Sequence, residues 1–311
     1  MMPALMTTGV MVMPRLDPRE RAFRQTREAQ LRRIARLDRL VARDVRQAFD
    51  EARVRIRSAL AGEDLSDFAQ ARLTALLPEI DRQAAALAGA MADLADEAVA
   101  TGAVLGADMA RVPLMAAGVS GISSSLTAVS ATQIAGIRNF TTGKIRNISN
   151  NLAREIGDEL ALALTGAVNR QQVLGFITAR VTGGMRRAQT IVNTELGRAY
   201  STAAQDRLAA AAEDVPGLKK QWRRSGKLRS RPSHDRIDGQ VVGVDEKFRL
   251  KAGLVKLNYP RDPAGPAAET INCGCTSLPF VEDWEMAAPG AQPLSDDDIA
   301  RLNTAGGRWR V

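Results

Sequence analysis

The sequence predicts a mainly α-helical protein, in which long amphipathic helices are followed by a small α+β carboxy-terminal module. Hydrophobic residues make up 45% of the 311 residues, which is enough to fill real cores, whereas aromatic residues make up only 4%. Burial must therefore come mainly from alanine and aliphatic side chains packed closely on helices. Beyond Pro216 the composition changes to scattered Gly, Pro and Asp between short β-prone segments, which predicts the α+β module.

The first hundred residues predict a flexible arm followed by a helical hairpin. Residues 1–16 have no basic segment ahead of their apolar run and no clear cleavage signal, so we interpret them as an arm rather than a secretory peptide. Residues 17–100 predict two antiparallel helices, with Asp17 as the cap and Pro18 at the first helical position. The first helix carries an apolar stripe at steps of three and four residues, formed by Ile34, Leu37, Val41, Val45, Ala48, Ala52 and Ile56.

The middle of the chain predicts a connector and then further helices. Residues 101–142 are rich in Gly, Ala, Ser and Thr, which lowers the helical tendency, so a connector is expected there. This region includes an uncharged stretch long enough to cross a bilayer, but Pro113 and the many small polar residues argue against a membrane span. A helical pattern resumes over residues 143–214, and Pro216 closes it.

The end of the chain predicts the module and a tail. Short β-prone pieces at residues 240–242 and 247–248 indicate strands within the module, which is expected to cover residues 215–282. Residues 283–311 form the predicted tail, in which Ser295 caps a short helix that begins with acidic residues.

The positive charge of the chain favours polyanionic partners. A net charge of +8 and a pI near 10.1 suit nucleic acid, although an evenly spread excess of Lys and Arg only keeps a surface solvated. The densest basic cluster lies at residues 219–231, where two interpretations stay open: salt-sensitive contacts with phosphates, or arginines that bridge to local carboxylates. The candidate nucleic-acid-binding residues are Lys219, Lys220, Trp222, Arg223, Arg224, Lys227, Arg229 and Arg231.

Common enzyme motifs are missing from the sequence. It contains no GxxxxGK(S/T) phosphate loop, no GxGxxG, no GxSxG nucleophile elbow and no HExxH zinc helix. His234 is the only histidine, so any histidine-dependent catalysis or metal binding must use it. The only two cysteines, Cys273 and Cys275, stand one residue apart, which would strain a disulfide and fits a reducing cytoplasm better than a secreted scaffold.

His234, Cys273 and Cys275 form the candidate metal site. One imidazole nitrogen and two thiolates suit Zn²⁺, and a structural zinc would tie the start of the module to its end. The alternative is that the three side chains are buried structural residues without a metal. A zinc deaminase would need His-x-Glu and Pro-Cys-x-x-Cys, which the sequence does not contain. Water or a nearby carboxylate would supply the fourth ligand, and the candidate carboxylates are Asp235, Asp238 and Asp262.

Several sequence blocks near the end of the chain follow one another in a distinctive order. A strand with Trp222 precedes the block Ser-His-Asp-Arg-Ile-Asp-Gly, then Phe248, then Tyr-Pro-Arg-Asp, then Glu-Thr-Ile-Asn-Cys-Gly-Cys. This order resembles the Mu F-like family of phage minor head (head morphogenesis) proteins, whose helix with a Thr-Glu pair also has a counterpart upstream. The family commonly has arginine where this chain has Gly274. The structural motif residues that match are Thr194, Glu195, Asp238, Gly239, Tyr259, Pro260, Asp262 and Asn272.

The resemblance covers roughly residues 145–279 and implies a low-copy component of a phage head. Such a component associates with the portal protein and other head proteins, takes part in head assembly and can contact packaged double-stranded DNA. The implied location is the interior of the virion head near the portal, and the host cytoplasm during assembly. The resemblance implies neither catalytic activity nor a small-molecule substrate.

Two other functions remain open. One is a toxin-like, metal-dependent nuclease or transferase that uses His234 and nearby carboxylates such as Asp235 or Glu195. Against it, Glu195 has no second titratable partner nearby in sequence, which favours a structural pairing with the arginines of the module over acid catalysis. The other is a plain DNA-binding protein, in which residues 215–282 bind DNA in a salt-sensitive manner.

Overall fold

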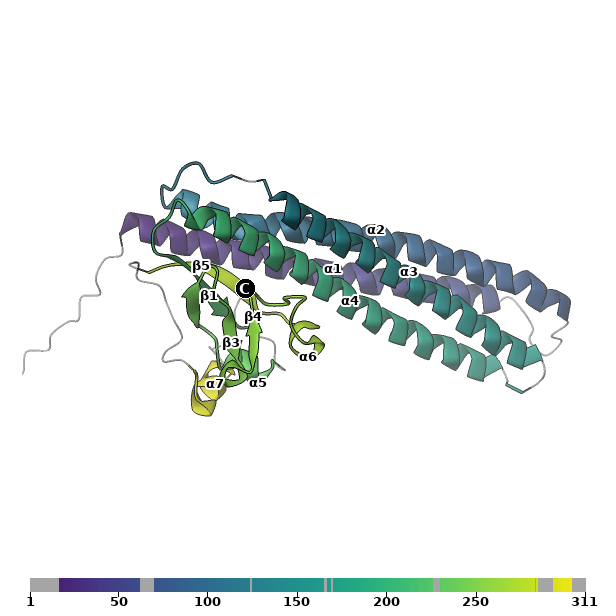
Figure 1. Cartoon of the computed structure of the whole chain (residues 1–311). Helices are drawn as coiled ribbons and strands as arrows, with labels where there is room; N and C mark the ends of the chain where they lie inside the picture. The colour runs from purple at the N-terminus through teal and green to yellow at the C-terminus, as the bar shows by residue number, and fades with distance from the viewer. Residues whose placement is uncertain are drawn as a thin grey trace, which may run out of the picture.

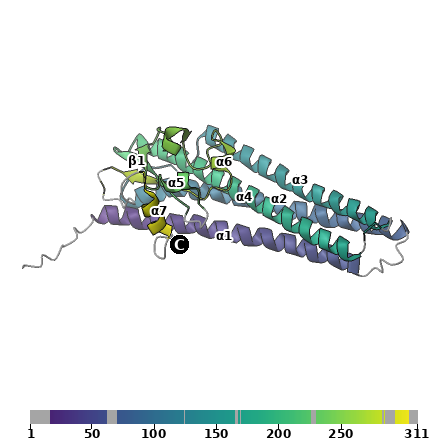
Figure 2. The ribbon, with the colours of Figure 1, turned by 90° about the horizontal axis from the view of Figure 1, so that it is seen from below.

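Four long helices form an elongated bundle, and a small module of short strands and helices lies against one half of its length (Figure 1). The other half of the bundle extends beyond the module (Figure 2). This arrangement, seen in a computed structural model, confirms the predicted fold class. The structure describes residues 17–61, 70–123, 125–164, 167–168, 170–225, 230–282, 284 and 293–303.

Helix α1 (Pro18–Ala61) begins where the sequence predicted. The carboxylate of Asp17 accepts a hydrogen bond from the backbone N–H of Arg19 at 2.7 Å, which satisfies one of the free donors of the first turn. Pro18 has no N–H that could be left unpaired. The predicted apolar stripe faces the core of the bundle: Val41, Val45, Ala52 and Ile56 are buried, and Ile34, Leu37 and Ala48 pack against them.

Helix α2 (Gln70–Ala116) packs against each of the other three long helices. The sequence predicted that this helix ends near Ala100 and that a connector follows over residues 101–142. Instead, α2 continues to Ala116, and helix α3 (Ala128–Leu164) occupies much of the remaining stretch. Small residues weaken an isolated helix, but here they allow close packing between helices, so tertiary contacts outweigh local propensity.

Two glycines of α2 lie against the backbone of helix α4 (Arg170–Ala212). A β-carbon at Gly106 would lie 2.1 Å from the carbonyl oxygen of Tyr200, and one at Gly102 would lie 2.8 Å from the carbonyl oxygen of Leu196. Only glycine permits this separation of the two helices.

One helix of the described residues passes a simple test for a membrane span. The segment Leu76–Ala116 is long and apolar enough to cross a bilayer, yet 61% of its most apolar window is buried inside the protein. Buried core helices pass the same test, so this finding does not indicate a span. The uncharged stretch noted in the sequence is interrupted between Ala116 and Ala128, where one helix ends and the next begins.

The module is built on a three-stranded antiparallel sheet in the order β2–β1–β5, with a separate antiparallel pair, β3–β4. Strands occur at or next to the segments that the sequence predicted as β-prone. As expected, Ser295 caps the last helix: its hydroxyl oxygen accepts a hydrogen bond from the backbone N–H of Asp298 at 3.1 Å. The strands are β1 (Leu218–Arg223), β2 (Val241–Gly243), β3 (Phe248–Leu250), β4 (Val255–Leu257) and β5 (Thr276–Val281). The short helices are α5 (Pro232–Asp235), η2 (Lys251–Gly253), α6 (Ala267–Thr270) and α7 (Asp296–Asn303).

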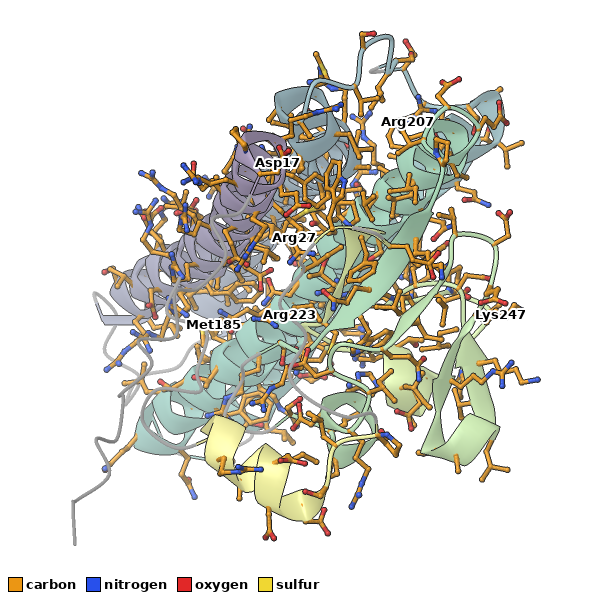
Figure 3. The ribbon with its side chains drawn as sticks, turned by 90° about the vertical axis from the view of Figure 1, so that its left-hand side faces the viewer. Asp17, Arg27, Met185, Arg207, Arg223 and Lys247 are labelled. Atoms are coloured by element: carbon orange, nitrogen blue, oxygen red, sulfur yellow. The ribbon has the colours of Figure 1, made fainter. Side chains whose placement is uncertain are left out.

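The sheet and the bundle share a hydrophobic core. Leu218 of β1 and Val281 of β5 are buried in one cluster with Phe23 of α1 and Leu208 of α4. Arg27 of α1 also donates a hydrogen bond to the carbonyl oxygen of Pro279 in β5 at 3.1 Å. Seen from the end at which α1 begins, Arg27 and Arg223 lie between the bundle and the module (Figure 3). The module is therefore held in place by both apolar packing and polar contacts.

The close contact between α2 and α4 predicts opposite effects for two similar substitutions. Gly106→Ala should destabilise the protein by about 1 to 3 kcal/mol, because the new methyl group collides with the backbone of Tyr200. Gly89→Ala in the same helix should instead stabilise it by about 0.5 to 1 kcal/mol, because nothing lies within 4 Å of its β-carbon and alanine favours helix. Urea unfolding, followed by circular dichroism, measures the free energy of unfolding of both variants. Equal changes in the two variants would refute this packing.

Candidate functional site

Two distant segments of the module bring His234, Cys273 and Cys275 together. His234 lies in α5, and the two cysteines lie between α6 and β5. The Nδ1 atom of His234 is 3.5 Å from each cysteine Sγ, and the three ligand atoms lie within 4.8 Å of one another. All three residues are buried: His234 is 1% exposed, Cys273 3% and Cys275 2%. The structure thus assembles the predicted cluster, and its atoms can hold a metal ion.

A carboxylate fixes the other nitrogen of the His234 ring. The Nε2 atom lies 2.9 Å from Oε2 of Glu269, which the sequence offered only as part of a family-like block. Burial acts to raise the pKa of Glu269, but hydrogen bonds from Lys251, His234 and Ser233 keep that pKa below its usual value. A charged Glu269 accepts the Nε2 proton, and Nδ1 is the ring nitrogen that faces the two sulfur atoms. Metal-binding histidines are commonly oriented by a carboxylate in this way.

Aromatic rings close the cluster on one side. The Trp222 ring meets the His234 ring edge to face, with centroids 5.3 Å apart and an interplanar angle of 84°. Phe248 packs on Trp222 in the same manner at 5.2 Å. Both aromatic side chains are fully buried, so they keep bulk water away from the imidazole.

The two thiols have opposite pKa shifts. The neighbouring Cys275 side chain, together with the His234 ring, holds the pKa of the Cys273 thiol well below its usual value. Burial, followed by the nearby Cys273 sulfur, raises the pKa of Cys275. The backbone N–H of Cys275 also donates to Cys273 Sγ at 3.4 Å. The arrangement therefore favours one thiolate in a buried site, and a bound cation would allow the second thiol to lose its proton.

The carboxylates considered as a fourth ligand have other partners. Asp235 lies 3.4 Å from Arg224 Nε, and Asp238 accepts the backbone N–H of Arg224 at 3.0 Å. Asp262 accepts the backbone N–H of Asn258 at 2.8 Å and so shapes its own loop. Among the described residues, none of these carboxylates joins the cluster of three ligand atoms. Because these carboxylates have other partners, water is the remaining candidate for the fourth ligand of a metal ion.

The basic cluster at residues 219–231 is largely turned inward. Lys220 and Trp222 are fully buried, and Arg224 is 3% exposed. Burial lowers the pKa of Lys220 to about 8, and its Nζ donates to the carbonyl oxygen of Asn258 at 2.9 Å. Strand β1 is covered by the bundle on one side and by the β3–β4 pair on the other, which explains why a basic segment is buried.

Two further residues of the basic cluster make local contacts at the surface. Lys219 forms an ion pair with Glu282, and Arg231 donates to the carbonyl oxygen of Ile271 at 2.7 Å. Lys227 and Arg229 lie outside the described residues. DNA binding by this cluster stays a prediction, and the contacts favour the alternative in which its charges are satisfied locally.

Of the Thr-Glu pair of α4, Thr194 contacts the module, whereas Glu195 pairs within its own helix. The hydroxyl oxygen of Thr194 accepts the backbone N–H of Asn272 at 2.9 Å, beside the two cysteines. Glu195 forms a two-pronged ion pair with Arg198 of its own helix, at 2.6 and 2.7 Å, rather than with an arginine of the module. Burial raises the pKa of Glu195, while Arg198 and the more distant charge of Arg261 oppose that rise.

The other motif residues shape turns of the module. Gly239 has a φ of +87°, a conformation that side chains rarely adopt, and its N–H donates to the carbonyl oxygen of Trp222 at 2.8 Å. The hydroxyl oxygen of Tyr259 lies 3.4 Å from that of Thr202 in α4, and Pro260 is buried next to it. These residues position the loop that carries Arg261.

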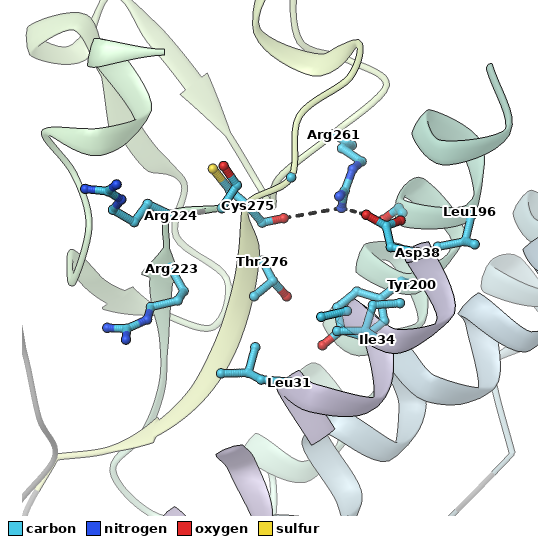
Figure 4. Close-up of a pocket in the computed structure, with 14 residues that line it drawn as sticks. Leu31, Ile34, Asp38, Leu196, Tyr200, Arg223, Arg224, Arg261, Cys275 and Thr276 are labelled. Carbon is cyan, nitrogen blue, oxygen red and sulfur yellow. Dashed lines mark hydrogen bonds between the residues drawn. The ribbon is translucent and has the colours of Figure 1, made fainter. Parts of the chain in front are cut away.

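Arg261 joins the cysteine segment to the bundle, a role that the sequence did not predict. Its Nε donates to the carbonyl oxygen of Cys273 at 2.6 Å, and its Nη1 donates to those of Cys275 at 3.3 Å and Gly197 at 3.1 Å. Figure 4 shows the side chain reaching from the module to α4. A β-carbon at Gly197 would lie 2.2 Å from Cζ of Arg261, so any side chain there would displace the guanidinium.

A pocket lies beside the cluster, between α1, α4 and the module (Figure 4). Apolar side chains of the helices, among them Leu31 and Leu196, form one wall, and Arg223, Arg224 and Cys275 line the opposite side. His234 is not among the residues that line this pocket. A small molecule bound there would contact arginines but would not reach the imidazole.

The contact between Arg261 and α4 predicts that a single methyl group weakens the attachment of the module. Gly197→Ala should displace the guanidinium and leave buried carbonyl groups unpaired, at a cost of about 2 kcal/mol or more. Amide hydrogen exchange should increase over residues 261–276. Gly183→Ala in the same helix is the control, because nothing lies within 4 Å of its β-carbon. Unchanged exchange in Gly197→Ala would show that Arg261 does not hold the module.

Comparisons with known proteins agree with the order of motifs. Residues 154–278 match the family described as "Phage Mu protein F like protein". An uncharacterized protein, YqbB, of Bacillus subtilis is 36% identical over 117 residues, which cover 37% of this chain and 36% of that protein. The minor head protein GP7 of Bacillus phage SPP1 is 26% identical over 147 residues, which cover 47% of this chain and 45% of that protein.

A third relative is named as an enzyme. The NAD(+)–arginine ADP-ribosyltransferase EFV of Enterococcus faecalis is 28% identical over 133 residues, which cover 43% of this chain and 27% of that protein. The chain therefore spans less than half the length of each of these relatives. No solved structure matches the chain.

The family match includes α4 and the module from β1 almost to the end of β5. Residues 154–278 therefore form a Mu F-like segment, as the order of their motifs predicted.

Proposed function

We propose that the chain is a minor head protein that takes part in head morphogenesis of a tailed phage or prophage. In this role it associates with the portal protein and other head proteins, in the interior of the head near the portal, after assembly in the host cytoplasm. The Mu F-like segment and the similarity to a minor head protein support the proposal.

One observation carries the proposal: the only histidine is locked inside the module. His234 is 1% exposed, lies against Trp222 and Glu269, and faces two buried cysteines. A catalytic acid or base must reach its substrate, and this imidazole has no such access. Its surroundings suit a clamp that keeps the module rigid for contact with other head proteins.

We further propose that the clamp is a structural zinc site. His234 Nδ1 and the thiolates of Cys273 and Cys275 would hold the ion, with water as the fourth ligand and Glu269 as the partner of the other ring nitrogen. The ion would supply the positive charge that a buried pair of thiolates requires. It would stabilise the fold without taking part in a reaction.

The zinc site predicts a measurable metal content. Purified protein should contain about one zinc per chain, and Cys273→Ser or Cys275→Ser should lose it, because serine keeps the shape of the side chain but binds zinc weakly. Removal of zinc by a chelator should lower the free energy of unfolding by about 2 kcal/mol or more. Elemental analysis and thermal unfolding measure the two effects. Protein that is metal-free and indifferent to added zinc would favour simple packing of the three residues.

The head-protein proposal predicts where the chain is found. In a phage that encodes it, the chain should sediment with purified heads in a density gradient, and it should be retained by the tagged portal protein of that phage. Particles assembled without the chain should be defective in head formation or in infection. Complete absence of the chain from heads, together with no retention by the portal protein, would refute the proposal.

The named transferase among the relatives supports a second candidate, a toxin-like transferase or nuclease. The similarity covers only 27% of that enzyme, so its activity does not follow for this chain. Incubation of the full chain with NAD⁺ and an arginine-containing acceptor, or with DNA and a divalent metal ion, tests it. Turnover that disappears in His234→Ala, with the fold intact, would favour the enzyme over the head protein.

A further inference from the structure

Helix α1 is strongly positively charged, and arginine supplies all of its positive charges. It contains thirteen arginines, no lysine and six acidic residues, so its net charge over 44 residues is +7. The family match begins at residue 154, far beyond this helix. A strongly positive element of the protein therefore lies outside the Mu F-like segment and apart from the inward-turned basic cluster at residues 219–231.

Five of these arginines form a continuous row on the outer face of α1. Helical geometry places them within about 80° of the helix circumference and along about 21 Å of its axis. The apolar residues of α1 that enter the bundle core lie on the opposite face. Side chains that end in nitrogen project from α1 away from the other helices (Figure 3). We call this row the arginine ladder, and it consists of Arg32, Arg36, Arg39, Arg43 and Arg46.

The ladder is exposed, and its charges are largely unneutralised. All five side chains belong to exposed residues. Within the part of the chain that the structure describes, only Arg43 has an ion pair, with the adjacent Asp44 at 2.8 Å. Glu28 and Asp50 stand on the same face only beyond the two ends of the ladder. A solvated helix surface normally mixes both signs of charge, which this 21 Å stretch, about four turns long, does not.

The composition of the ladder favours phosphate groups over other anions. Guanidinium groups present a planar fork of donors that matches phosphate, and α1 uses arginine throughout, with no lysine. Duplex DNA carries one negative charge per about 1.7 Å of its axis with both strands counted, so 21 Å of duplex carries about twelve phosphates, of which those on one side face the ladder. Each arginine could thus contact a phosphate without a fixed register. An acidic protein surface would instead need carboxylates at matching positions.

The absence of aromatic side chains from this face favours a duplex over a single strand. Proteins that hold single strands stack aromatic rings on the bases. Both aromatic residues of α1, Phe23 and Phe49, are buried in the bundle. The outer face therefore offers charge without a surface for stacking.

We infer that the arginine ladder of α1 binds the phosphate backbone of double-stranded DNA without sequence preference. The inference deepens the proposed function and rests on it for the presence of DNA beside the protein. It assigns DNA contact to the bundle rather than to the carboxy-terminal module. The bundle, which extends beyond the module, would lie along the DNA with α1 facing it.

Binding of the full chain to a 30-base-pair duplex of arbitrary sequence, measured by fluorescence anisotropy from 50 to 200 mM salt, tests the inference. The ladder variant replaces four arginines by glutamine, and the control variant removes the same charge from exposed positions of α3 and α4. The ladder variant should bind at least about tenfold more weakly, and the slope of log affinity against log salt should fall by about 3 to 4. The ladder variant changes Arg32, Arg36, Arg39 and Arg46, and the control variant changes Arg146, Arg154, Arg186 and Arg187.

Three outcomes would overturn the inference: no binding of the duplex by the wild-type chain, equal losses in the two variants, or displacement of the duplex by polyglutamate of equal charge. The last would identify an acidic protein as the partner. Circular dichroism should be the same for all three proteins, since the substituted side chains are exposed. A chain that binds DNA through the ladder but is absent from heads would refute the proposed function and leave this inference intact.

Discussion

The position of the candidate metal site depends on one buried guanidinium. Arg261 is 6% exposed and donates to the carbonyl oxygens of Cys273, Cys275 and Gly197. A buried charge without partners would cost several kcal/mol, so these carbonyl groups must converge on it. The same interaction therefore fixes the backbone of both cysteines and attaches the module to α4. The site cannot form in its observed shape unless the module is docked.

A chain of polar groups continues from the site to the surface of the module. The thiolate of Cys273 faces His234, the imidazole faces Glu269, and Glu269 forms an ion pair with Lys251 at 2.5 Å. Each of these polar groups has a polar partner. The cluster is thus a continuous polar network inside an apolar wall, which explains how a small module with few aromatic residues keeps polar side chains buried.

Sequence reasoning predicted the features that depend on local pattern or on rare residues. The cap and stripe of α1, the module and the gathering of the only histidine with the only two cysteines follow from spacing and composition. The length of α2 did not, because small residues weaken a helix alone and strengthen it only when α4 lies against Gly106. The roles of Glu269 and Arg261 arise from contacts between distant segments. The inward orientation of Lys220 arises because β1 is covered on both sides.

The shared core has a consequence for how the Mu F-like segment can be reused in other proteins. That segment contains α4 but neither α1 nor α2, although Leu196 and Tyr200 of α4 are buried beneath those two helices. Transplanted alone, the segment would leave an apolar stripe of α4 open to water. Any protein that carries it must supply helices of its own to cover that stripe. The segment therefore supplies one side of a helix interface, and the helices on the other side can differ from one protein to another.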